Sequence, residues 1–216
     1  MASYEKPDFW SLKAQKEGYP ARSVYKLIEI DGKFGLLGKA SQGRPRILDL
    51  GAAPGSWSLY ILRRFKPHVS TDAGEPPLLT AVDIQNLSRR FDKGLFDRKD
   101  FFFIRGDFGS AEVRDIVSGR GPYTVLLSDA APATTGNRTV DTQRSLALAE
   151  QVLAYADSVL APGGNLAMKV FQGSGAEDLP ARLRERFTGV RSFKPKTCRS
   201  DSFETYFLGL GKKEHS

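Results

Sequence analysis

Three aspartates of the sequence follow or close runs of apolar residues that are typical of β-strands: Asp83, Asp107 and Asp129. If these strands are parallel neighbours, their carboxyl ends meet at one edge of the sheet, where such sheets bind ligands. An acid after the second strand can accept hydrogen bonds from both hydroxyls of a ribose, and an acid after the third can accept the exocyclic amine of an adenine. Taken singly, each aspartate could instead form an Asx turn or cap a helix.

The three carboxylates together favour one kind of ligand charge. They would repel the phosphates of a dinucleotide, whereas a ligand with positive charge and no phosphate would suit them. S-adenosylmethionine has both properties, because its sulfonium is positive. The sequence therefore predicts a site for S-adenosylmethionine, with Asp83 at the ribose and Asp107 at the adenine.

A glycine-rich turn after the first expected strand supports a nucleoside site. The segment 49–57 is Asp-Leu-Gly-Ala-Ala-Pro-Gly-Ser-Trp, and its glycines let the backbone turn tightly and approach a ligand. Its spacing matches neither the dinucleotide fingerprint G-x-G-x-x-G nor the phosphate-binding motif G-x-x-x-x-G-K-[ST], which argues against a nicotinamide oxidoreductase and a nucleoside triphosphatase. We expect cofactor contacts from Gly51, Gly55 and Trp57. A purely structural strand-turn-helix unit is the alternative.

The elements that must position these residues alternate between strand and helix. This alternation predicts a Rossmann-like α/β fold with a mostly parallel sheet and helices on both faces. The last two strands have no helix between them, which predicts an antiparallel pair. The expected strands are 46–50, 78–84, 100–104, 123–128, 165–170, 190–194 and 204–210, and the expected helices are 19–37, 56–65, 110–118, 141–160 and 176–187.

The distribution of charge indicates a polyanionic partner. The chain has 216 residues and a formal net charge of +7. Residues 1–46 hold nine Lys and Arg against five acids, and residues 182–199 hold seven against one. Two basic ends around a balanced middle are typical of nucleic-acid binding, and the alternative is two solvated helix faces. Aromatic residues interleave with these charges, and some could stack on an unpaired base: Phe9, Trp10, Tyr19, Tyr25 and Phe193.

Composition excludes several classes of protein. One cysteine, Cys198, and two histidines exclude a disulfide framework and leave almost nothing for a zinc centre or a Ser-His-Asp triad. We expect no bound metal. No apolar run is long enough to span a membrane, and the N-terminal segment has no signal-peptide pattern. We therefore expect a cytoplasmic protein without a membrane partner.

Five segments of the chain carry a family resemblance. Residues 49–57, the segment 127–132 (Leu-Ser-Asp-Ala-Ala-Pro) and the segment 168–173 (Met-Lys-Val-Phe-Gln-Gly) resemble the FtsJ/RrmJ-type ribose 2'-O-methyltransferases. So do 21–27 (Ala-Arg-Ser-Val-Tyr-Lys-Leu) and 202–206 (Ser-Phe-Glu-Thr-Tyr). The resemblance runs from about Phe9 to Gly211. The departures are Ser56, where the family commonly has glycine, and a Pro-rich insertion at 66–77.

The resemblance implies a class I methyltransferase fold, which is a seven-stranded sheet with an antiparallel last strand, and S-adenosylmethionine as cofactor. It implies a catalytic tetrad of Lys26, Asp129, Lys169 and Glu204. The substrate it implies is a ribose 2'-hydroxyl, most closely that of a uridine in large-subunit ribosomal RNA. We expect one domain over 1–216, with a basic helical extension at 1–45 and a flexible insertion at 66–77.

A general base is needed because a 2'-hydroxyl is a poor nucleophile. Lys169 is our candidate: it lies in an apolar strand, where an unpaired lysine is costly and needs partners or a function. The alternative is a lysine that extends to solvent at a strand end. Asp129 would lie near the methionine end of the cofactor and orient Lys169. Lys26 and Glu204 would hold the nucleotide and the lysine in place, although each could be an ordinary surface charge.

Three alternatives stay open at this point. The enzyme could act on transfer RNA or another RNA, or on a small molecule or protein. It could also be a ribosome-assembly factor of the same fold without turnover, which the intact tetrad disfavours. We expect a monomer with no obligate protein partner and with the large ribosomal subunit or its RNA as substrate.

Overall fold

The computed structural model describes residues 8–38, 45–65, 78–173, 175–199 and 202–214. The expected insertion at 66–77 lies outside the described residues, as do the beginning and the end of the expected extension at 1–45.

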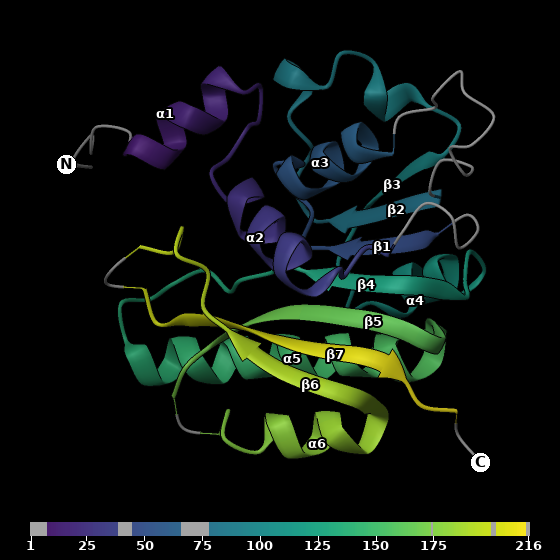
Figure 1. Ribbon diagram of the computed structural model, residues 1–216, viewed down its shortest axis with the longest axis vertical. Coiled ribbons are helices and arrows are strands. Elements are labelled where there is room, and N and C mark those ends of the chain that lie inside the picture. The colour runs from purple at the N-terminus through teal and green to yellow at the C-terminus, as the bar shows by residue number, and fades with distance from the viewer. Residues whose placement is uncertain (1–7, 39–44, 66–77, 174, 200–201, 215–216) are drawn as a thin grey trace.

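A seven-stranded sheet forms the centre of the molecule (Figure 1). Its order is β3-β2-β1-β4-β5-β7-β6, in which only β7 runs antiparallel to its neighbours. The predicted α/β sheet with an antiparallel last strand is therefore confirmed. The strands are β1 (Arg46–Leu50), β2 (Leu78–Asp83), β3 (Phe101–Arg105), β4 (Tyr123–Ser128), β5 (Leu160–Phe171), β6 (Phe187–Phe193) and β7 (Glu204–Lys212).

Helices cover both faces of the sheet, as the alternation predicted (Figure 1). Successive strand residues point to opposite faces. In β1, Ile47 belongs to the core under α1, α2 and α3, while Leu48 and Leu50 belong to the core under α4, α5 and α6. The helices are α1 (Phe9–Lys16), α2 (Val24–Phe34), α3 (Ser56–Arg64), α4 (Ala111–Ser118), α5 (Arg138–Val159) and α6 (Leu179–Arg186), with short 3₁₀ turns η2 (Arg89–Phe91) and η3 (Leu95–Asp97).

The expected helix over 19–37 is shorter, and a separate helix precedes it. Asp8 caps α1 by accepting a hydrogen bond from the backbone N–H of Ser11. The chain then turns at Gly18, whose φ is +76°, and Pro20 follows, so the two helices do not merge. Gly35 ends α2 in the left-handed conformation. The apolar face of α2 packs fully into the core, so this helix is part of the domain body.

Two other boundaries differ because strand pairing extends beyond the sequence pattern. β5 begins at Leu160, since Leu160 pairs with Tyr123 of β4, and not at 165. β6 begins at Phe187, directly after α6, where Phe187 is buried and pairs with Lys212 of β7. Both differences lengthen strands that the sequence placed correctly.

Within the described parts of the chain, no helix combines the length and apolar character that crossing a membrane would require. The same residues contain no group of three or more His, Cys, Asp or Glu side chains arranged to hold a metal ion.

Candidate active site

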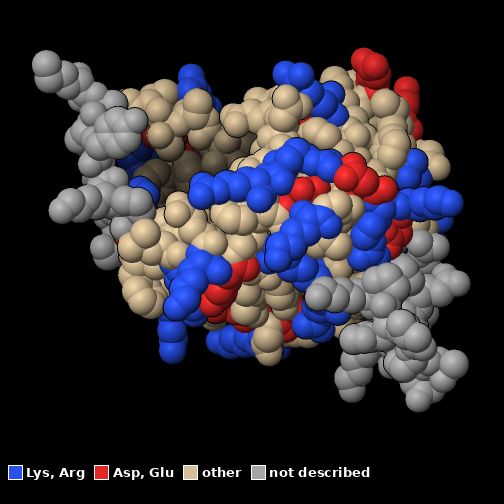
Figure 2. All heavy atoms as spheres, turned by 90° about the horizontal axis from the view of Figure 1, so that it is seen from above, with Lys and Arg blue, Asp and Glu red and all other residues tan. Residues whose placement is uncertain are grey.

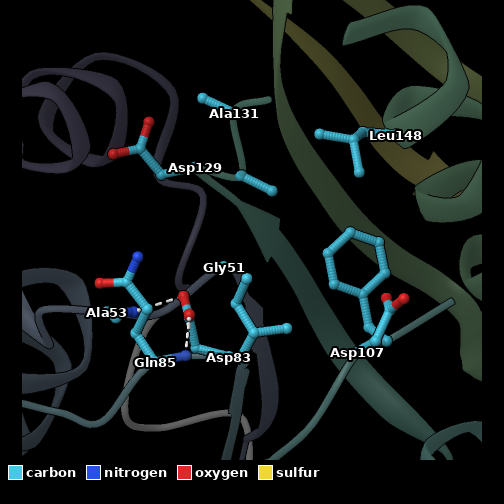
Figure 3. A pocket seen from close by; sticks show the side chains of 11 residues that line it. Gly51, Ala53, Asp83, Gln85, Asp107, Asp129, Ala131 and Leu148 are labelled. Carbon is cyan, nitrogen blue, oxygen red and sulfur yellow. Dashed lines mark hydrogen bonds between the residues drawn. The ribbon is translucent and has the colours of Figure 1, made fainter. Parts of the chain in front are cut away.

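A cavity of about 380 Å³ opens at the carboxyl ends of the parallel strands (Figure 3). Its wall includes four of the predicted residues: Gly51, Asp83, Asp107 and Asp129. Gly51 has a φ of +75°, and a Cβ at this position would lie 2.6 Å from the Cα of Ala130. Only glycine therefore lets the turn after β1 approach the turn after β4 this closely.

The Asp83 carboxylate is held by two backbone groups. One oxygen accepts a hydrogen bond from the N–H of Ala53 and the other from the N–H of Gln85, both at 2.8 Å (Figure 3). These bonds fix the carboxylate at the end of β2 while each oxygen keeps a second lone pair for a ligand. Asp83 is therefore placed to accept hydrogen bonds from a ribose.

Asp107 and its neighbours form the opposite side of the cavity. The Asp107 carboxylate accepts a hydrogen bond from the N–H of Gly109 at 2.7 Å and is itself exposed. The apolar part of the wall consists of Phe108, Leu148 and Ile84. Ile84 is a large apolar residue that is 64% exposed. An apolar slot with a carboxylate at its rim suits a purine ring with an exocyclic amine.

Gly55 and Trp57 are not in the wall of this cavity. Gly55, with a φ of +104°, packs against Phe96, where a Cβ would lie 2.9 Å from the ring. Trp57 is buried: its indole N–H donates to the carbonyl of Ser23, and its ring packs against Tyr206. The structure thus gives both residues a role in closing the turn between β1 and α3 and not a place at the cavity surface.

The four tetrad residues form two ion pairs beside this cavity. The Lys169 Nζ lies 3.0 Å from Asp129 Oδ1 and donates to the Asp129 backbone carbonyl at 2.6 Å. The Lys26 Nζ lies 2.6 Å from Glu204 Oε1. The four side chains, between 9% and 15% exposed, are too buried to be ordinary surface charges. The structure therefore brings together all four residues that the family resemblance implies.

Tyr206 connects the two pairs, and sequence reasoning missed it. Its hydroxyl donates to Asp129 Oδ1 at 2.6 Å, and the Lys26 Nζ lies 5.8 Å from its ring centre. In the register of β5 with β7, Tyr206 is opposite Lys169, so both project from the same face. The spacing of Glu204 and Tyr206, two residues apart on one strand, was a signal that could have found it.

Charge and burial shift the pKa in opposite directions at Asp129 and Lys26, and in the same direction at Tyr206. Burial raises the pKa of the Asp129 carboxyl, but Lys169, Lys26 and the Tyr206 hydroxyl outweigh burial and hold its pKa below the usual value. Burial lowers the pKa of Lys26, but Asp129 and Glu204 outweigh it, and the net pKa is raised. Burial and the two carboxylates raise the pKa of Tyr206 well above its usual value. Tyr206 therefore stays a hydrogen-bond donor.

Asp49 is, after Tyr206, another residue that sequence reasoning did not include in the site. It is fully buried, accepts a hydrogen bond from the Ser58 hydroxyl at 2.7 Å, and leaves Oδ1 without a partner among the described residues. Burial raises the pKa of Asp49 to about 7, the Ser58 bond opposes this shift, and the charges of Asp129 and Asp83 add to it. Its place inside β1, facing α3, gave no sequence signal apart from the motif itself.

A second cavity, of about 480 Å³, adjoins the tetrad on its other side. Lys26 and Glu204 contribute to its wall, together with Arg22 and Arg199. Arg22 is also paired with Asp8 and donates to the carbonyl of Thr197, which fixes the segment before α2. The first cavity is walled by acids and the second carries three cations, so the two cavities differ in the ligand charge that they favour.

The basic stretch 182–199 is divided by the fold. On α6, Arg182 pairs with Glu150, and Arg186 pairs with Asp157 at 2.8 Å, so these guanidiniums are neutralised. Residues 194–199, which we call the basic loop, follow β6 at the active-site edge and are tied to α2 by Glu29, which accepts from the N–H groups of Lys196 and Thr197. The cations of the basic loop are Lys194, Lys196 and Arg199.

Charges of both signs also alternate on the side of α1 and α3. Figure 2 shows Lys and Arg side chains interspersed with Asp and Glu on this face, and not a patch of one sign. Two of the aromatic residues considered for base stacking, Tyr19 and Tyr25, are buried in the core. Trp10 packs on Tyr25, and Phe193 packs on Phe34. None of the five lines either cavity.

Comparisons with known proteins agree on one family. A family model described as FtsJ-like methyltransferase matches residues 19–212. The "Ribosomal RNA large subunit methyltransferase E" of Treponema denticola is 45% identical over 210 residues, which is 97% of each chain.

Solved structures show the same fold. A Plasmodium falciparum protein described as a ribosomal RNA methyltransferase has a TM-score of 0.73 and 26% identity, and the match covers 91% of this chain and 100% of that one. A Burkholderia thailandensis 1,6-didemethyltoxoflavin-N1-methyltransferase with bound S-adenosylhomocysteine has a TM-score of 0.51 at 15% identity, with 100% and 93% covered, and shows likeness of fold alone.

Proposed function

The chain belongs to the FtsJ-like methyltransferase family, and from that premise we propose that it transfers a methyl group to a ribose 2'-hydroxyl of large-subunit ribosomal RNA. The relatives named as ribosomal RNA large subunit methyltransferases cover almost the whole chain, which supports this class of substrate. A uridine is the nucleotide that the family resemblance favours.

The first cavity fits S-adenosylmethionine. Asp83, Asp107 and Asp129 surround it, and none of the described wall residues is Lys or Arg, so the cavity favours a cation without phosphate. Asp83 would hold the ribose, and Asp107 with the apolar wall would hold the adenine. When bound, this cofactor supplies an electrophilic methyl group on a positively charged sulfur.

One observation carries the proposal: the tetrad lies between two cavities of opposite character. Asp129 is in the wall of the first cavity, whereas Lys26 and Glu204 are in the wall of the second. A nucleotide in the second cavity would present its ribose to this boundary. Three cations against one acid leave the wall of the second cavity positively charged, which suits the phosphates of such a nucleotide.

Lys169 is the residue that we assign to the 2'-proton. Its Nζ is within reach of two oxygens of Asp129, which is itself in the wall of the first cavity. In this role the neutral amine accepts the proton of the 2'-hydroxyl, and the Asp129 carboxylate orients the amine. Tyr206 holds the same carboxylate from the β7 side, and Lys26 with Glu204 fixes the nucleotide side.

The experiment that tests this function uses tritiated S-adenosylmethionine. The full chain is incubated with large subunits, small subunits and transfer RNA from cells that lack the enzyme, and the labelled nucleotide is then mapped. We expect label only in the large subunit, at a nucleotide whose 3' linkage resists alkaline hydrolysis. Label confined to transfer RNA would transfer the assignment to that substrate, and no label in any RNA would leave the assembly-factor alternative.

A further inference from the structure

The second cavity has an aromatic wall that methyl transfer as described above does not use. Phe203, just before β7, and Phe171, at the end of β5, both line this cavity. Their ring centroids are 4.7 Å apart with an interplanar angle of 62°. The guanidinium of Arg138, in the first turn of α5, lies 5.3 Å from the Phe203 ring centre.

The position of this wall relative to the tetrad is set by strand pairing. Phe171 is opposite Glu204 in the register of β5 with β7, and Phe203 immediately precedes Glu204. Glu204 in turn pairs with Lys26. The aromatic wall therefore begins one residue away from the charged groups that face the ribose.

The size of the cavity limits what can enter it. A volume of about 480 Å³ is in the range of pockets for small ligands, so it suits one nucleotide and not a stretch of double helix. A nucleotide that places its ribose at the tetrad must therefore be unpaired or turned out of its helix, and its base then loses its stacking neighbours. Aromatic side chains compensate for this loss in proteins that bind single-stranded RNA.

We propose that the Phe171–Phe203 wall packs against the base of the target nucleotide and makes the enzyme selective for an unpaired or extruded nucleotide. This inference rests on the proposed function. The base lies on the aromatic wall, the phosphates lie toward Arg22 and Arg199, and the 2'-hydroxyl points to the tetrad. Phe203 is then a positioning residue, because it orients the ribose through the base.

A second aromatic pair in the molecule provides a matched control. Phe193 packs edge-on against Phe34 with centroids 5.5 Å apart, and the Lys33 Nζ lies 4.6 Å from the Phe193 ring. The arrangement of two rings and one cation is the same as in the wall. Neither ring of this pair is in the wall of the two cavities described above.

The test compares Phe203→Ala, Phe203→Leu and Phe193→Ala in methyl transfer to large subunits, after thermal unfolding has shown that each variant is folded. We expect Phe203→Ala to lower kcat/KM on the order of 10-fold or more, mainly through KM, because base stacking on an aromatic ring has an effect of that order. Phe203→Leu should lose less, and Phe193→Ala should match the wild type. Affinity for S-adenosylhomocysteine should be unchanged in all three.

A crosslinking arm does not depend on turnover. Large-subunit RNA transcribed with 4-thiouridine is irradiated with the enzyme, and the crosslinked peptides are identified by mass spectrometry. We expect a crosslink from the target nucleotide to the segment around Phe203. The proposal is wrong if that nucleotide crosslinks only elsewhere, or if Phe203→Ala keeps the wild-type KM. Absence of methyl transfer by the wild type would refute the proposed function instead, and the crosslink would still decide where the base binds.

Discussion

At the scale of single residues, Lys169 is the side chain on which the chemistry depends most. Its Nζ has two oxygen partners on Asp129, and Asp129 is in the wall of the first cavity. Such a lysine could act as a base or could only position the ribose by its positive charge. These two roles differ in whether the amine must lose a proton.

Replacement of Lys169 separates the two roles. We expect Lys169→Ala to keep the fold and cofactor binding but to lose methyl transfer by roughly 100-fold or more. Lys169→Arg should be nearly as damaging, since a guanidinium stays protonated. Single-turnover rates with saturating RNA and cofactor measure both effects. An active Arg variant would mean that the charge alone matters and that another group takes the proton.

Asp83 tests the cofactor site. Asp83→Asn keeps the size of the side chain but removes its negative charge. In the wild type this carboxylate accepts hydrogen bonds from the N–H groups of Ala53 and Gln85. We expect S-adenosylhomocysteine to bind more weakly by about 1–3 kcal/mol, measured by calorimetry. Asp115→Asn, an exposed substitution on α4, should bind it normally. Equal affinity in the two variants would remove Asp83 from the site.

Asp49 predicts a pH dependence of stability. Its pKa of about 7 in the folded chain is above the ordinary value of 3.8. Between these pH values the folded state holds a proton that the unfolded state has lost, so the contribution of Asp49 to stability falls as the pH rises. Asp49→Asn removes this titration. Its free energy of unfolding relative to the wild type should therefore rise from pH 4 to pH 7, by up to a few kcal/mol in order of magnitude.

Urea unfolding at several pH values measures this difference. Asp115→Asn serves again as the exposed control, and its difference from the wild type should stay small across the range. A constant difference between Asp49→Asn and the wild type at all pH values would show that the carboxyl is not protonated in the folded chain.

At the scale of elements, the fold separates basic residues that are neighbours in the sequence. Arg182 and Arg186 of α6 pair with acids of α5, whereas the basic loop after β6 is held against α2 beside the second cavity. The end of β6 thus decides which cations lie at the active-site edge. The number of positive charges in 182–199 does not by itself give the RNA-binding surface.

Charge reversal tests this division. We expect Lys194→Glu with Lys196→Glu to weaken binding of large-subunit RNA by 10-fold or more, because two phosphate contacts are lost and two repulsions are added. Arg184→Glu, at an exposed position of α6, should have little effect. Filter binding measures RNA affinity, and calorimetry should show unchanged cofactor affinity. Equal losses of RNA affinity in the α6 variant and the basic-loop variant would mean that RNA contacts both parts of the stretch 182–199.

At the scale of the whole molecule, the net charge of +7 favours RNA binding that weakens with salt. RNA binding that releases counterions must weaken steeply as salt rises, with a log–log slope of roughly −0.7 to −0.9 for each phosphate neutralised. We expect the wild type to show such a slope and the Lys194→Glu, Lys196→Glu variant to show a shallower one. A flat dependence for the wild type would favour the small-molecule alternative.

Much of this molecule could be predicted from its sequence. The seven strands, the antiparallel β7 and the alternation of helices followed from apolar periodicity, because a strand or helix must bury one face wherever it packs. The three acids followed from their places at strand ends, and the tetrad followed from the family resemblance. Boundaries were less certain, since Leu160 and Phe187 are strand residues only because a neighbouring strand pairs with them.

Only the tertiary structure decided which side chains meet. Trp57 faces the core and not the cavity, because α3 turns its indole toward Ser23 and Tyr206. Tyr206 and Phe203 reach the active-site edge because β7 runs back beside β5, and residues far apart in the sequence become cross-strand neighbours there. Local sequence fixes the type and direction of each element, whereas contacts between elements depend on pairing and packing across the whole chain.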